Sequence, residues 1–348
     1  MATNFNNAKK LSAEGENDSY WTQLETILKE TYAYPYELFR DKGVFLNCDE
    51  GKHSNFYVWG NKMFEKLRLK RVSAVGYNKG ASRVRVDVIY RDEKGNKIFD
   101  YYYLEGEDGS FDGEQSIKLM REHEIVMTNP PFSLMKYFFP LVMSCINDPT
   151  AKTEYFSIIS NIAATGYKEI WPYFFNGQVW WGDETQDVEF EVPLSYEPRN
   201  NRYRETIVDG ELKKYRSLGN IRWFTNFPIE KRNYLIKNRT KKWERGLADG
   251  TYKEYDNYKG VYEMNRVENI PCDLPKGTRI GVPFTFLDKH NPNQFKLIGI
   301  LTAKDDPENG FFCGEKMEYK DKDGKIRKAK KGIIDGKCYT DRIIIEKL

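Results

Sequence analysis

Short apolar runs alternate with helix-like stripes over the first half of the chain. Runs bounded by polar or glycine-containing segments are typical of buried strands. Between them lie stretches whose apolar residues recur at helical spacing. The predicted strands are 44–46, 72–76, 125–128, 155–160 and 179–181, and the predicted helices are 19–39, 55–69 (with Ser54 as N-cap), 115–122 and 167–175.

Residues 83–103 follow a different pattern, in which apolar and polar side chains alternate strictly. Val84, Val86 and Val88 point one way, and a turn at 93–96 precedes a second alternating run. This pattern predicts a β-hairpin. Because strands separated by helices are typical of βαβ units, we expect an α/β fold with a mainly parallel sheet and the hairpin as an insertion.

The second half of the chain gives weaker signals. After residue 183 the alternation of strand and helix fades, and residues 229–280 are rich in Tyr, Lys, Arg and Asn. The polar residues 1–17 predict a disordered lead-in. Late strands are predicted at 221–225, 282–287, 295–301 and 342–345.

Composition narrows the class of protein. The 348 residues are 40% hydrophobic and 31% charged, a balance typical of globular chains. No stretch approaches the roughly 20 apolar residues that span a bilayer, and the polar N-terminus lacks a signal-peptide core. Five scattered cysteines suit a reducing compartment. We therefore expect a cytoplasmic protein with no membrane partner.

Metal chemistry has no support in the pattern of ligands. The three histidines, His53, His123 and His290, lie far from one another and from any cysteine pair. We predict no metal site. The net charge of +3 indicates no partner by itself.

One tetrapeptide carries chemistry: Asn129-Pro130-Pro131-Phe132, directly after a predicted strand. An exocyclic amine on an aromatic base is a poor nucleophile because its lone pair is delocalised into the ring. The Asn129 side-chain oxygen and the Pro130 carbonyl can each accept one amine hydrogen, and two prolines keep these acceptors preorganised. Phe132 offers a ring on which the base can stack. The plainer alternative is a rigid strand-to-helix turn.

This tetrapeptide resembles motif IV of amino-directed, S-adenosylmethionine-dependent methyltransferases. The chain as a whole resembles the EcoRI-type adenine-specific DNA methyltransferase family from about residue 18 to the C-terminus. The resemblance implies a Rossmann-like methyltransferase domain over 18–228, with a mainly parallel seven-stranded sheet, and a DNA target-recognition region over 229–348. The matching segments are 18–22, 47–49, 54–56, 128–134, 167–170, 219–226 and 281–288.

The resemblance also implies a cofactor site. Asn47-Cys48-Asp49 stands where a glycine-rich turn is usual, with Asp49 facing the ammonium of the methionine moiety. The helix start at Ser54 and Asn55 would face its carboxylate. Tyr20-Trp21-Thr22 resembles the N-terminal cofactor-contacting element. The alternatives are a solvated loop acid for Asp49 and ordinary helix packing for 20–22.

Two further elements are implied near the bases of cofactor and target. Asp108 and Phe111 lie where relatives use Asp-Phe beside the cofactor adenine, but here Ser110 precedes the phenylalanine, so the acid is displaced. Trp223 and Phe224 resemble the aromatic element that forms the second wall of the target-base pocket. Their alternative is a strand core.

Basic residues cluster late in the chain. Residues 221–245 hold eight Lys and Arg against two Glu, and residues 316–331 hold eight against three acids. Such runs are often solvated faces, but beside a base-modifying site they favour a phosphate-tracking surface. The residues predicted to bind DNA are Arg222, Lys231, Arg232, Arg239, Lys241 and Lys242.

Together these features predict a DNA adenine N6-methyltransferase that flips its target adenine out of the duplex and methylates it directly. Its expected cofactor is S-adenosylmethionine, its expected partner double-stranded DNA, and a separately encoded restriction endonuclease is an open further partner. Two alternatives stay open: methylation of RNA or of protein glutamine, and a catalytically inactive DNA-binding protein on the same fold.

Overall fold

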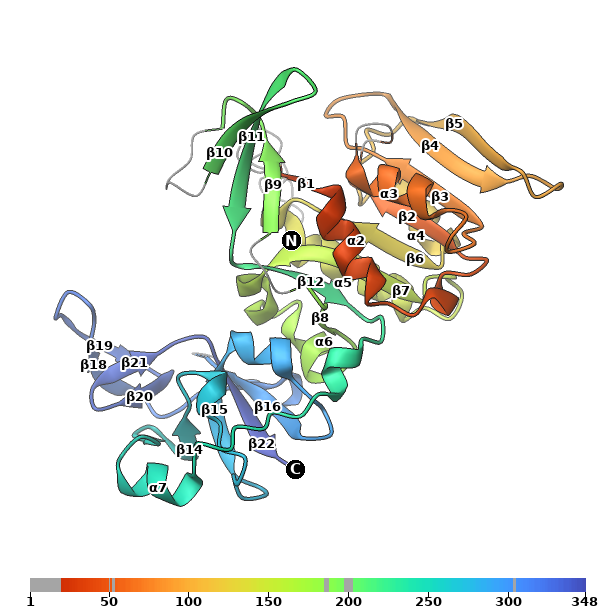
Figure 1. Ribbon diagram of the computed structural model, residues 1–348. Coiled ribbons are helices and arrows are strands. Elements are labelled where there is room, and N and C mark those ends of the chain that lie inside the picture. The colour runs from red at the N-terminus through yellow and green to blue at the C-terminus, as the bar shows by residue number, and fades with distance from the viewer. Residues whose placement is uncertain (1–19, 50, 52–53, 185–187, 197–202, 303–304) are drawn as a thin grey trace. The chain divides into compact units, whose positions relative to one another are not determined.

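The computed structural model describes residues 20–49, 51, 54–184, 188–196, 203–302 and 305–348, and the chain divides into two compact units. The predicted disordered lead-in, 1–17, lies outside the described residues. The first unit comprises residues up to 164 together with 181–229. The second comprises 165–180 and 230–348. Figure 1 labels their elements.

An eight-stranded sheet forms the centre of the first unit, in the order β5-β4-β3-β2-β6-β7-β12-β8. The pairs β3–β2, β2–β6 and β6–β7 are parallel, whereas β5–β4, β4–β3 and β7–β12 are antiparallel. The bounds are β2 Gly43–Asn47, β3 Arg71–Val75, β4 Arg83–Arg91, β5 Lys97–Glu105, β6 Ile125–Thr128, β7 Tyr155–Asn161, β8 Trp180–Trp181 and β12 Ile221–Thr225.

The prediction of a mixed α/β fold is confirmed, but a seven-stranded, mainly parallel sheet is not. The described sheet has eight strands, and its parallel part is limited to the four central ones. The difference has a local cause: the predicted hairpin does form, and β4 pairs along β3, so the insertion extends the sheet on one side.

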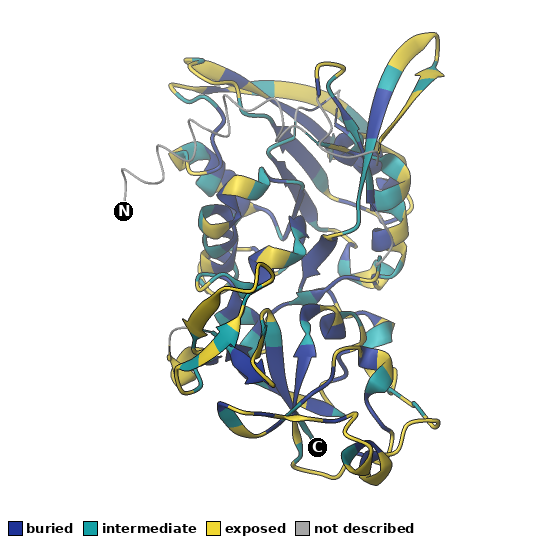
Figure 2. Cartoon of the chain, turned by 90° about the vertical axis from the view of Figure 1, so that its left-hand side faces the viewer, coloured by how far each residue is buried: buried dark blue, intermediate teal, exposed yellow. Residues whose placement is uncertain are grey.

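Helices cover both faces of this sheet, which explains why the central strands are apolar throughout. All five residues of β2 and all four of β6 are buried. Helix α2 packs on α3, and α4 packs on α5. Figure 2 shows the central strands as buried segments. The bounds are α2 Leu24–Tyr32, α3 Asn55–Met63, α4 Glu114–Glu122 and α5 Met135–Ile146.

A second, antiparallel sheet in this unit has the order β1-β9-β11-β10. It joins the first described strand to a segment far along the chain, with Trp21 opposite Glu191 and Thr22 opposite Phe190. The apolar stripe of 19–39 predicts a helix that includes residues 20–22. The structure shows that these residues are not helical, because 21–22 form strand β1. The bounds are β1 Trp21–Thr22, β9 Val188–Val192, β10 Tyr203–Val208 and β11 Glu211–Leu218.

The second unit is built on a six-stranded sheet in the order β13-β14-β15-β22-β16-β17, with two small hairpins beside it. The predicted strands at 295–301 and 342–345 are present, but the strand predicted at 282–287 ends at Pro283 and continues as a 3-10 helix. The bounds are α6 Trp171–Phe175, α7 Trp243–Ala248, β13 Glu254–Tyr255, β14 Tyr258–Glu263, β15 Arg279–Pro283, β16 Phe295–Leu301, β17 Phe311–Phe312, β18 Met317–Lys320, β19 Ile326–Ala329, β20 Gly332–Ile334, β21 Lys337–Tyr339 and β22 Arg342–Lys347.

Candidate active site

The carboxyl ends of β2 and β6 lie side by side at the point where the order of the parallel strands reverses. From β2 the chain continues to β3 on one side, and it returns to β6 on the other. Ligands of open α/β sheets bind at such a switch point, outside the carboxyl ends of the strands. Asn47 ends β2 and Thr128 ends β6, so the two motifs found in the sequence meet here.

A partly buried carboxylate connects these two strand ends. Ser54 Oγ donates to Asp49 Oδ1 at 2.6 Å, and Thr128 Oγ1 lies 3.1 Å from Asp49 Oδ2. The Thr128 hydroxyl is also within hydrogen-bond reach of the Asn47 carbonyl. Asp49 is thus held by side chains from α3 and β6, which argues against a solvated loop acid.

Burial raises the pKa of Asp49 to about 7, although the hydrogen bonds from Ser54 and Thr128 lower it. Among the described residues, no basic group contributes to the pKa of this carboxyl group. A carboxyl group whose pKa is raised in this way gains from a positively charged ligand group, which it can pair with in its ionised form. Burial, followed by the charge of Asp49, raises the pKa of the Cys48 thiol well above its usual range, so Cys48 is no thiolate nucleophile.

The turn between the strand and Asp49 has an unusual backbone. Cys48 has a φ of 68°, in the left-handed region, and its N–H donates to Asn47 Oδ1 at 2.9 Å. The other side-chain atom of Asn47, Nδ2, is buried and has no hydrogen-bond partner among the described residues. The turn therefore presents one spare buried donor beside the Asp49 carboxylate.

The N-terminal element is tied to the same region. Asn55 Nδ2 donates to the Thr22 carbonyl at 2.8 Å, and Ser54 caps α3 by accepting from Phe56 N at 3.0 Å. Thr22 Oγ1 is buried and lacks a described partner. Trp21 is 48% exposed. The structure thus brings Thr22, Ser54 and Asn55 together with Asp49, and Trp21 points away.

Asn129 follows β6 directly, and its amide is held in one orientation. Its Nδ2 donates to the main-chain carbonyl of Tyr20 at 2.7 Å. Its Oδ1 is buried and accepts no hydrogen bond from any described residue. Because the amide nitrogen is already engaged, the oxygen is the atom that Asn129 offers to a ligand.

Aromatic rings surround Phe132, which begins a short 3-10 helix, Phe132–Leu134. The Tyr20 ring stacks on Phe132 with centroids 5.7 Å apart and planes 21° apart. Phe190 meets both rings edge-on, and Tyr196 meets Tyr20 in the same way. These four residues, Tyr20, Phe132, Phe190 and Tyr196, are called the aromatic cluster below.

Sequence reasoning missed Phe190 and Tyr196. The signal for the strand was present, because Val188, Phe190 and Val192 alternate with two glutamates and are all buried. The place of Phe190 beside Phe132 had no signal, since it depends on the pairing of β9 with β1, more than 160 positions away.

The residues predicted beside the cofactor adenine lie in a tight turn. Asp108 Oδ1 accepts from Ser110 N at 3.1 Å, and the Ser110 hydroxyl bonds Asp112. Phe111 is buried and packs edge-on against Phe138, with centroids 5.2 Å apart. The Ser110 hydroxyl thus donates a hydrogen bond to the carboxylate of Asp112.

Trp223 and Phe224 have the packing of core residues. Both are 0% exposed in β12, where Trp223 meets Phe56 edge-on and Phe224 meets Phe139. Neither ring belongs to the aromatic cluster. The rings that contact Phe132 are those of Tyr20 and Phe190 instead.

The predicted DNA-binding residues fall into two groups. Arg222 is buried over the Trp181 ring and donates to the Ile221 carbonyl. Arg232 lies over the Trp180 ring, and burial lowers its pKa to about 10. These two arginines pack within the protein rather than standing free as phosphate ligands.

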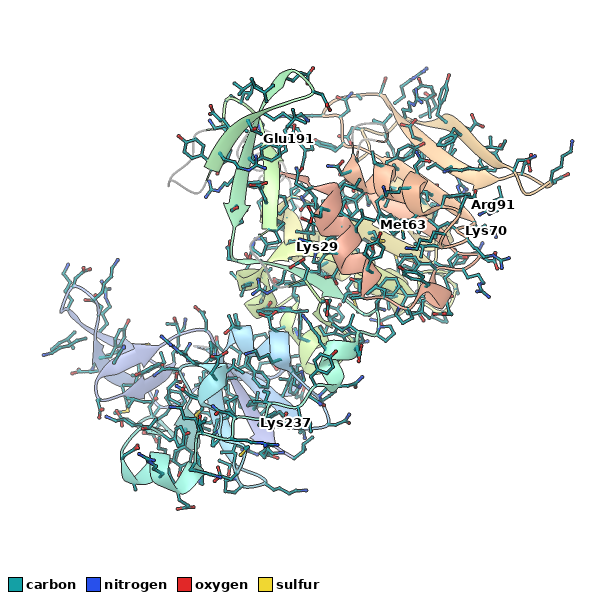
Figure 3. The ribbon with its side chains drawn as sticks, viewed as in Figure 1. Lys29, Met63, Lys70, Arg91, Glu191 and Lys237 are labelled. Atoms are coloured by element: carbon teal, nitrogen blue, oxygen red, sulfur yellow. The ribbon has the colours of Figure 1, made fainter. Side chains whose placement is uncertain are left out.

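The remaining predicted residues lie on the surface of the second unit. Arg239, Lys241 and Lys242 are exposed, and Lys242 lies 3.7 Å from Asp273. Lys231 and Lys241 line a pocket of about 700 Å³ together with Lys237, which Figure 3 labels. A fourth lysine, Lys289, also lines this pocket and pairs with Glu268 at 2.8 Å.

The described part of the chain contains neither a candidate metal site nor a candidate membrane-spanning helix. It contains no group of three His, Cys, Asp or Glu side chains that could hold a metal ion. Among the same residues, none of the helices is long and apolar enough to cross a membrane.

Comparison with known proteins gives a consistent result. The family described as adenine-specific methyltransferase EcoRI matches residues 4–348. The Type II methyltransferase M.MgeORF184P of Mycoplasma genitalium is 30% identical over 304 residues, which covers 85% of this chain and 86% of the relative. M.MpnI of Mycoplasma pneumoniae is 30% identical over 85% of both chains, and M.EcoRI of Escherichia coli is 30% identical over 88% of this chain and 94% of its own.

Proposed function

Because this chain belongs to the EcoRI adenine-specific methyltransferase family, we propose that it methylates the exocyclic amine of adenine in duplex DNA, using S-adenosylmethionine. The family expected from the sequence motifs is thus confirmed. Its relatives are Type II methyltransferases, which supports a DNA methyltransferase activity. That adenine N6 is the methylated atom is our more specific proposal.

The observation that carries the proposal is the unpartnered Oδ1 of Asn129. This buried acceptor stands at the carboxyl end of β6, and the Tyr20 carbonyl fixes the amide so that Oδ1 is free. An acceptor of this kind matches an amine N–H of the substrate. Accepting that hydrogen bond localises the nitrogen lone pair, and a preorganised acceptor needs no reorganisation when the amine reacts.

The buried polar atoms around Asp49 fit the proposed cofactor. Asp49 would hold the ammonium of its methionine moiety, and the unpartnered Asn47 Nδ2 and Thr22 Oγ1 add a donor and a hydroxyl at the same strand end. When bound, the cofactor supplies an electrophilic methyl group. The protein contributes by holding the carboxylate in place through Ser54 and Thr128.

Phe132 would stack on the adenine after the base has been flipped out of the duplex. The Tyr20 ring stacks directly on the Phe132 ring, with ring centroids 5.7 Å apart, which leaves no room for a base between the two rings. Insertion of the base on this face of Phe132 therefore requires the Tyr20 ring to turn aside, while Phe190 and Tyr196 border the space it leaves. The main-chain carbonyl of Tyr20 keeps its role, because it is fixed by the neighbouring strand β1.

Contacts with the DNA backbone are proposed for the second unit. Lys231 and Lys241 line the pocket of about 700 Å³ described above, and Arg239 and Lys242 lie exposed along the same stretch of chain. These cations would bind phosphates and set register rather than read bases. A cognate restriction endonuclease stays a proposed further partner.

The test is methyl transfer from labelled S-adenosylmethionine to unmethylated plasmid DNA, followed by mass spectrometry of the nucleosides. N6-methyladenine that disappears with Asn129→Ala supports the proposal. An unmodified plasmid with labelled RNA or labelled protein glutamine would move the function to those acceptors. No transfer to any acceptor, with intact DNA binding, would leave an inactive DNA-binding protein.

A further inference from the structure

Strand β5, Lys97–Glu105, is the outermost strand of the eight-stranded sheet. Figure 1 shows it at the rim, beyond β4. Within the described parts of the chain, no strand pairs with its outer side. Three large side chains on one face of this strand are exposed, with Phe99 at 56%, Tyr101 at 51% and Tyr103 at 38%.

The outward-facing backbone groups of β5 can be identified from the ends of the hairpin. Asp92 N donates to the Asn96 carbonyl at one end, and Gly106 N donates to the Ser82 carbonyl at the other. Bonding and non-bonding pairs alternate along an antiparallel ladder, so in β5 the even-numbered residues bond to β4. The main-chain groups of residues 97, 99, 101, 103 and 105 therefore point away from the sheet.

A hydrogen bond in the middle of the strand agrees with this assignment. Tyr101 N donates to the Asp100 side chain at 2.8 Å, which an N–H engaged with β4 would not do. Proteins usually protect such an edge with a proline, a bulge or an inward-pointing charge. The β4–β5 register runs without a break from Arg83–Glu105 to Arg91–Lys97, and β5 contains no proline.

The rings on this face are held in place by arginines from β4. The Arg83 guanidinium lies 3.9 Å from the centre of the Tyr103 ring, and that of Arg85 lies 4.0 Å from Tyr101. Arg85 is itself anchored to Asp87 at 2.6 Å. Because the rings are already ordered, little side-chain entropy is lost when a partner covers them.

The sequence of β5 complements itself in the antiparallel direction. With Tyr101 opposite Tyr101 of a second copy, Lys97 stands opposite Glu105 and Phe99 opposite Tyr103, and the pattern repeats on the other side of the two-fold axis. All nine residues are then paired, and every outward-facing residue meets another. Shifting by one allowed step places Glu105 opposite Gly95 or opposite Phe99, so the opposite charges no longer face each other at both ends.

We propose that β5 is a self-association surface, through which two copies of this chain pair antiparallel about a two-fold axis at Tyr101. The pairing joins two eight-stranded sheets and provides about eight main-chain hydrogen bonds while each Tyr101 N–H stays with its Asp100 side chain, and about ten if the two side chains release it. Aromatic cross-strand pairs and the Lys97–Glu105 pairs stabilise this register over its neighbours. In a single chain Lys97 Nζ donates to the main-chain and side-chain oxygens of Asn61, and a pair with Glu105 of the second copy would replace these bonds.

The register predicts one self-crosslink. In a bonded antiparallel pair the two Cα atoms are about 5.5 Å apart, which a disulfide can span. Tyr101→Cys, made in a Cys272→Ser background to remove the exposed native thiol, should form a covalent dimer under mild oxidation. Tyr103→Cys in the same background should not, because residue 103 faces residue 99. Crosslinking of neither variant, or of both equally, overturns the proposed register.

A second experiment needs no new thiol. Sedimentation of the full-length protein over a concentration series should show a monomer–dimer equilibrium. Tyr101→Lys places two like charges opposite each other at the axis and should raise the dissociation constant about tenfold or more. The matched control Ile207→Lys makes the same change at a 72% exposed strand residue elsewhere and should leave the equilibrium unchanged. A monomeric wild type throughout the series overturns the proposal, whatever the methyltransferase assay shows.

Discussion

Asn129 donates a 2.7 Å hydrogen bond from Nδ2 to the main-chain carbonyl of Tyr20, which stands 109 positions earlier in the chain. This bond decides which atom of the asparagine faces the site. An amide that was free to rotate would offer a donor as often as an acceptor, whereas here one Nδ2 hydrogen is fixed on the Tyr20 carbonyl and Oδ1 keeps a defined position as an acceptor. The N-terminal strand therefore positions the proposed amine acceptor through its backbone.

Replacing Asn129 by alanine should abolish most methyl transfer and leave binding intact. Loss of one preorganised hydrogen-bond partner of the reacting group costs about 10²–10³ in kcat. The measurement is single-turnover methyl transfer beside equilibrium binding of DNA and of S-adenosylmethionine. The matched comparison is Tyr20→Ala, which removes the ring but keeps the main-chain carbonyl. The orientation of the Asn129 amide should therefore be retained in this variant. Near wild-type turnover of Asn129→Ala would contradict the role assigned to its oxygen.

The pKa of Asp49 predicts how cofactor binding depends on pH. Burial raises that pKa from 3.8 to about 7, so below pH 7 the free protein holds a neutral acid. A cationic ligand group needs the carboxylate, so affinity should rise with pH up to about 7. It should fall again above about 8, where the α-amino group of the ligand itself loses its proton. Below the midpoint the loss approaches about tenfold per pH unit. Calorimetric titration of S-adenosylmethionine from pH 5.5 to 8.5 measures it.

The control for this experiment is Asp49→Asn, which keeps the shape and removes the titration. Its affinity should be low and should not rise between pH 5.5 and 7. The folded protein without ligand should behave in the opposite sense, because a raised carboxyl pKa means that stability is lost as pH rises through about 7. A wild-type affinity that does not change between pH 5.5 and 8.5 would remove Asp49 from the cofactor site.

Thr128→Val should move the same midpoint upward. The Thr128 hydroxyl is one of the two hydrogen bonds that lower the pKa of Asp49, and valine keeps the volume without the hydroxyl. The free energy of unfolding should fall by about 1 kcal/mol as well. Thr225→Val is the matched control, because Thr225 is equally buried and bonds the Phe156 carbonyl at 2.7 Å in β12. It should lose stability without moving the pH midpoint; equal midpoints in both variants would refute the link.

Removing Lys241 and Lys242 together should weaken DNA binding and flatten its salt dependence. Each phosphate contact contributes about 0.9 to the slope of log K against log salt, so the slope should fall by about 1.8. Lys29 and Lys70 are exposed lysines of the first unit, and Figure 3 labels both. Their double alanine variant removes the same charge and should leave the slope unchanged. Equal slopes for the two double variants would place 241–242 outside the DNA interface.

Local patterns predicted the centre of the catalytic unit well. The strands 125–128 and 221–225 have the bounds expected from their apolar runs, and Ser54 caps α3 as its hydroxyl suggested. Such features depend on neighbours in sequence, which a single chain displays. The position of Asn129 after β6 followed from the same reasoning.

Features that depend on distant pairing were not predicted. Residues 21–22 carry an apolar stripe that fits a helix, yet they form a strand because β9 supplies a partner. Trp223 and Phe224 are apolar and aromatic in either role, and only the packing of β12 distinguishes a core ring from a pocket wall. The same holds for Arg222, whose charge suggested DNA but whose side chain is buried over Trp181.

The pairing of β1 with β9 also sets an order of events during translation. Tyr20 leaves the ribosome early, but its strand has no partner until residues 188–192 have been synthesised. Contacts so distant in sequence form late in folding, after the local helices and the parallel strands. A nascent chain that has completed β6 and β7 already contains Asn129, yet nothing holds its amide. The amine acceptor becomes oriented only when the later half of the catalytic unit has emerged.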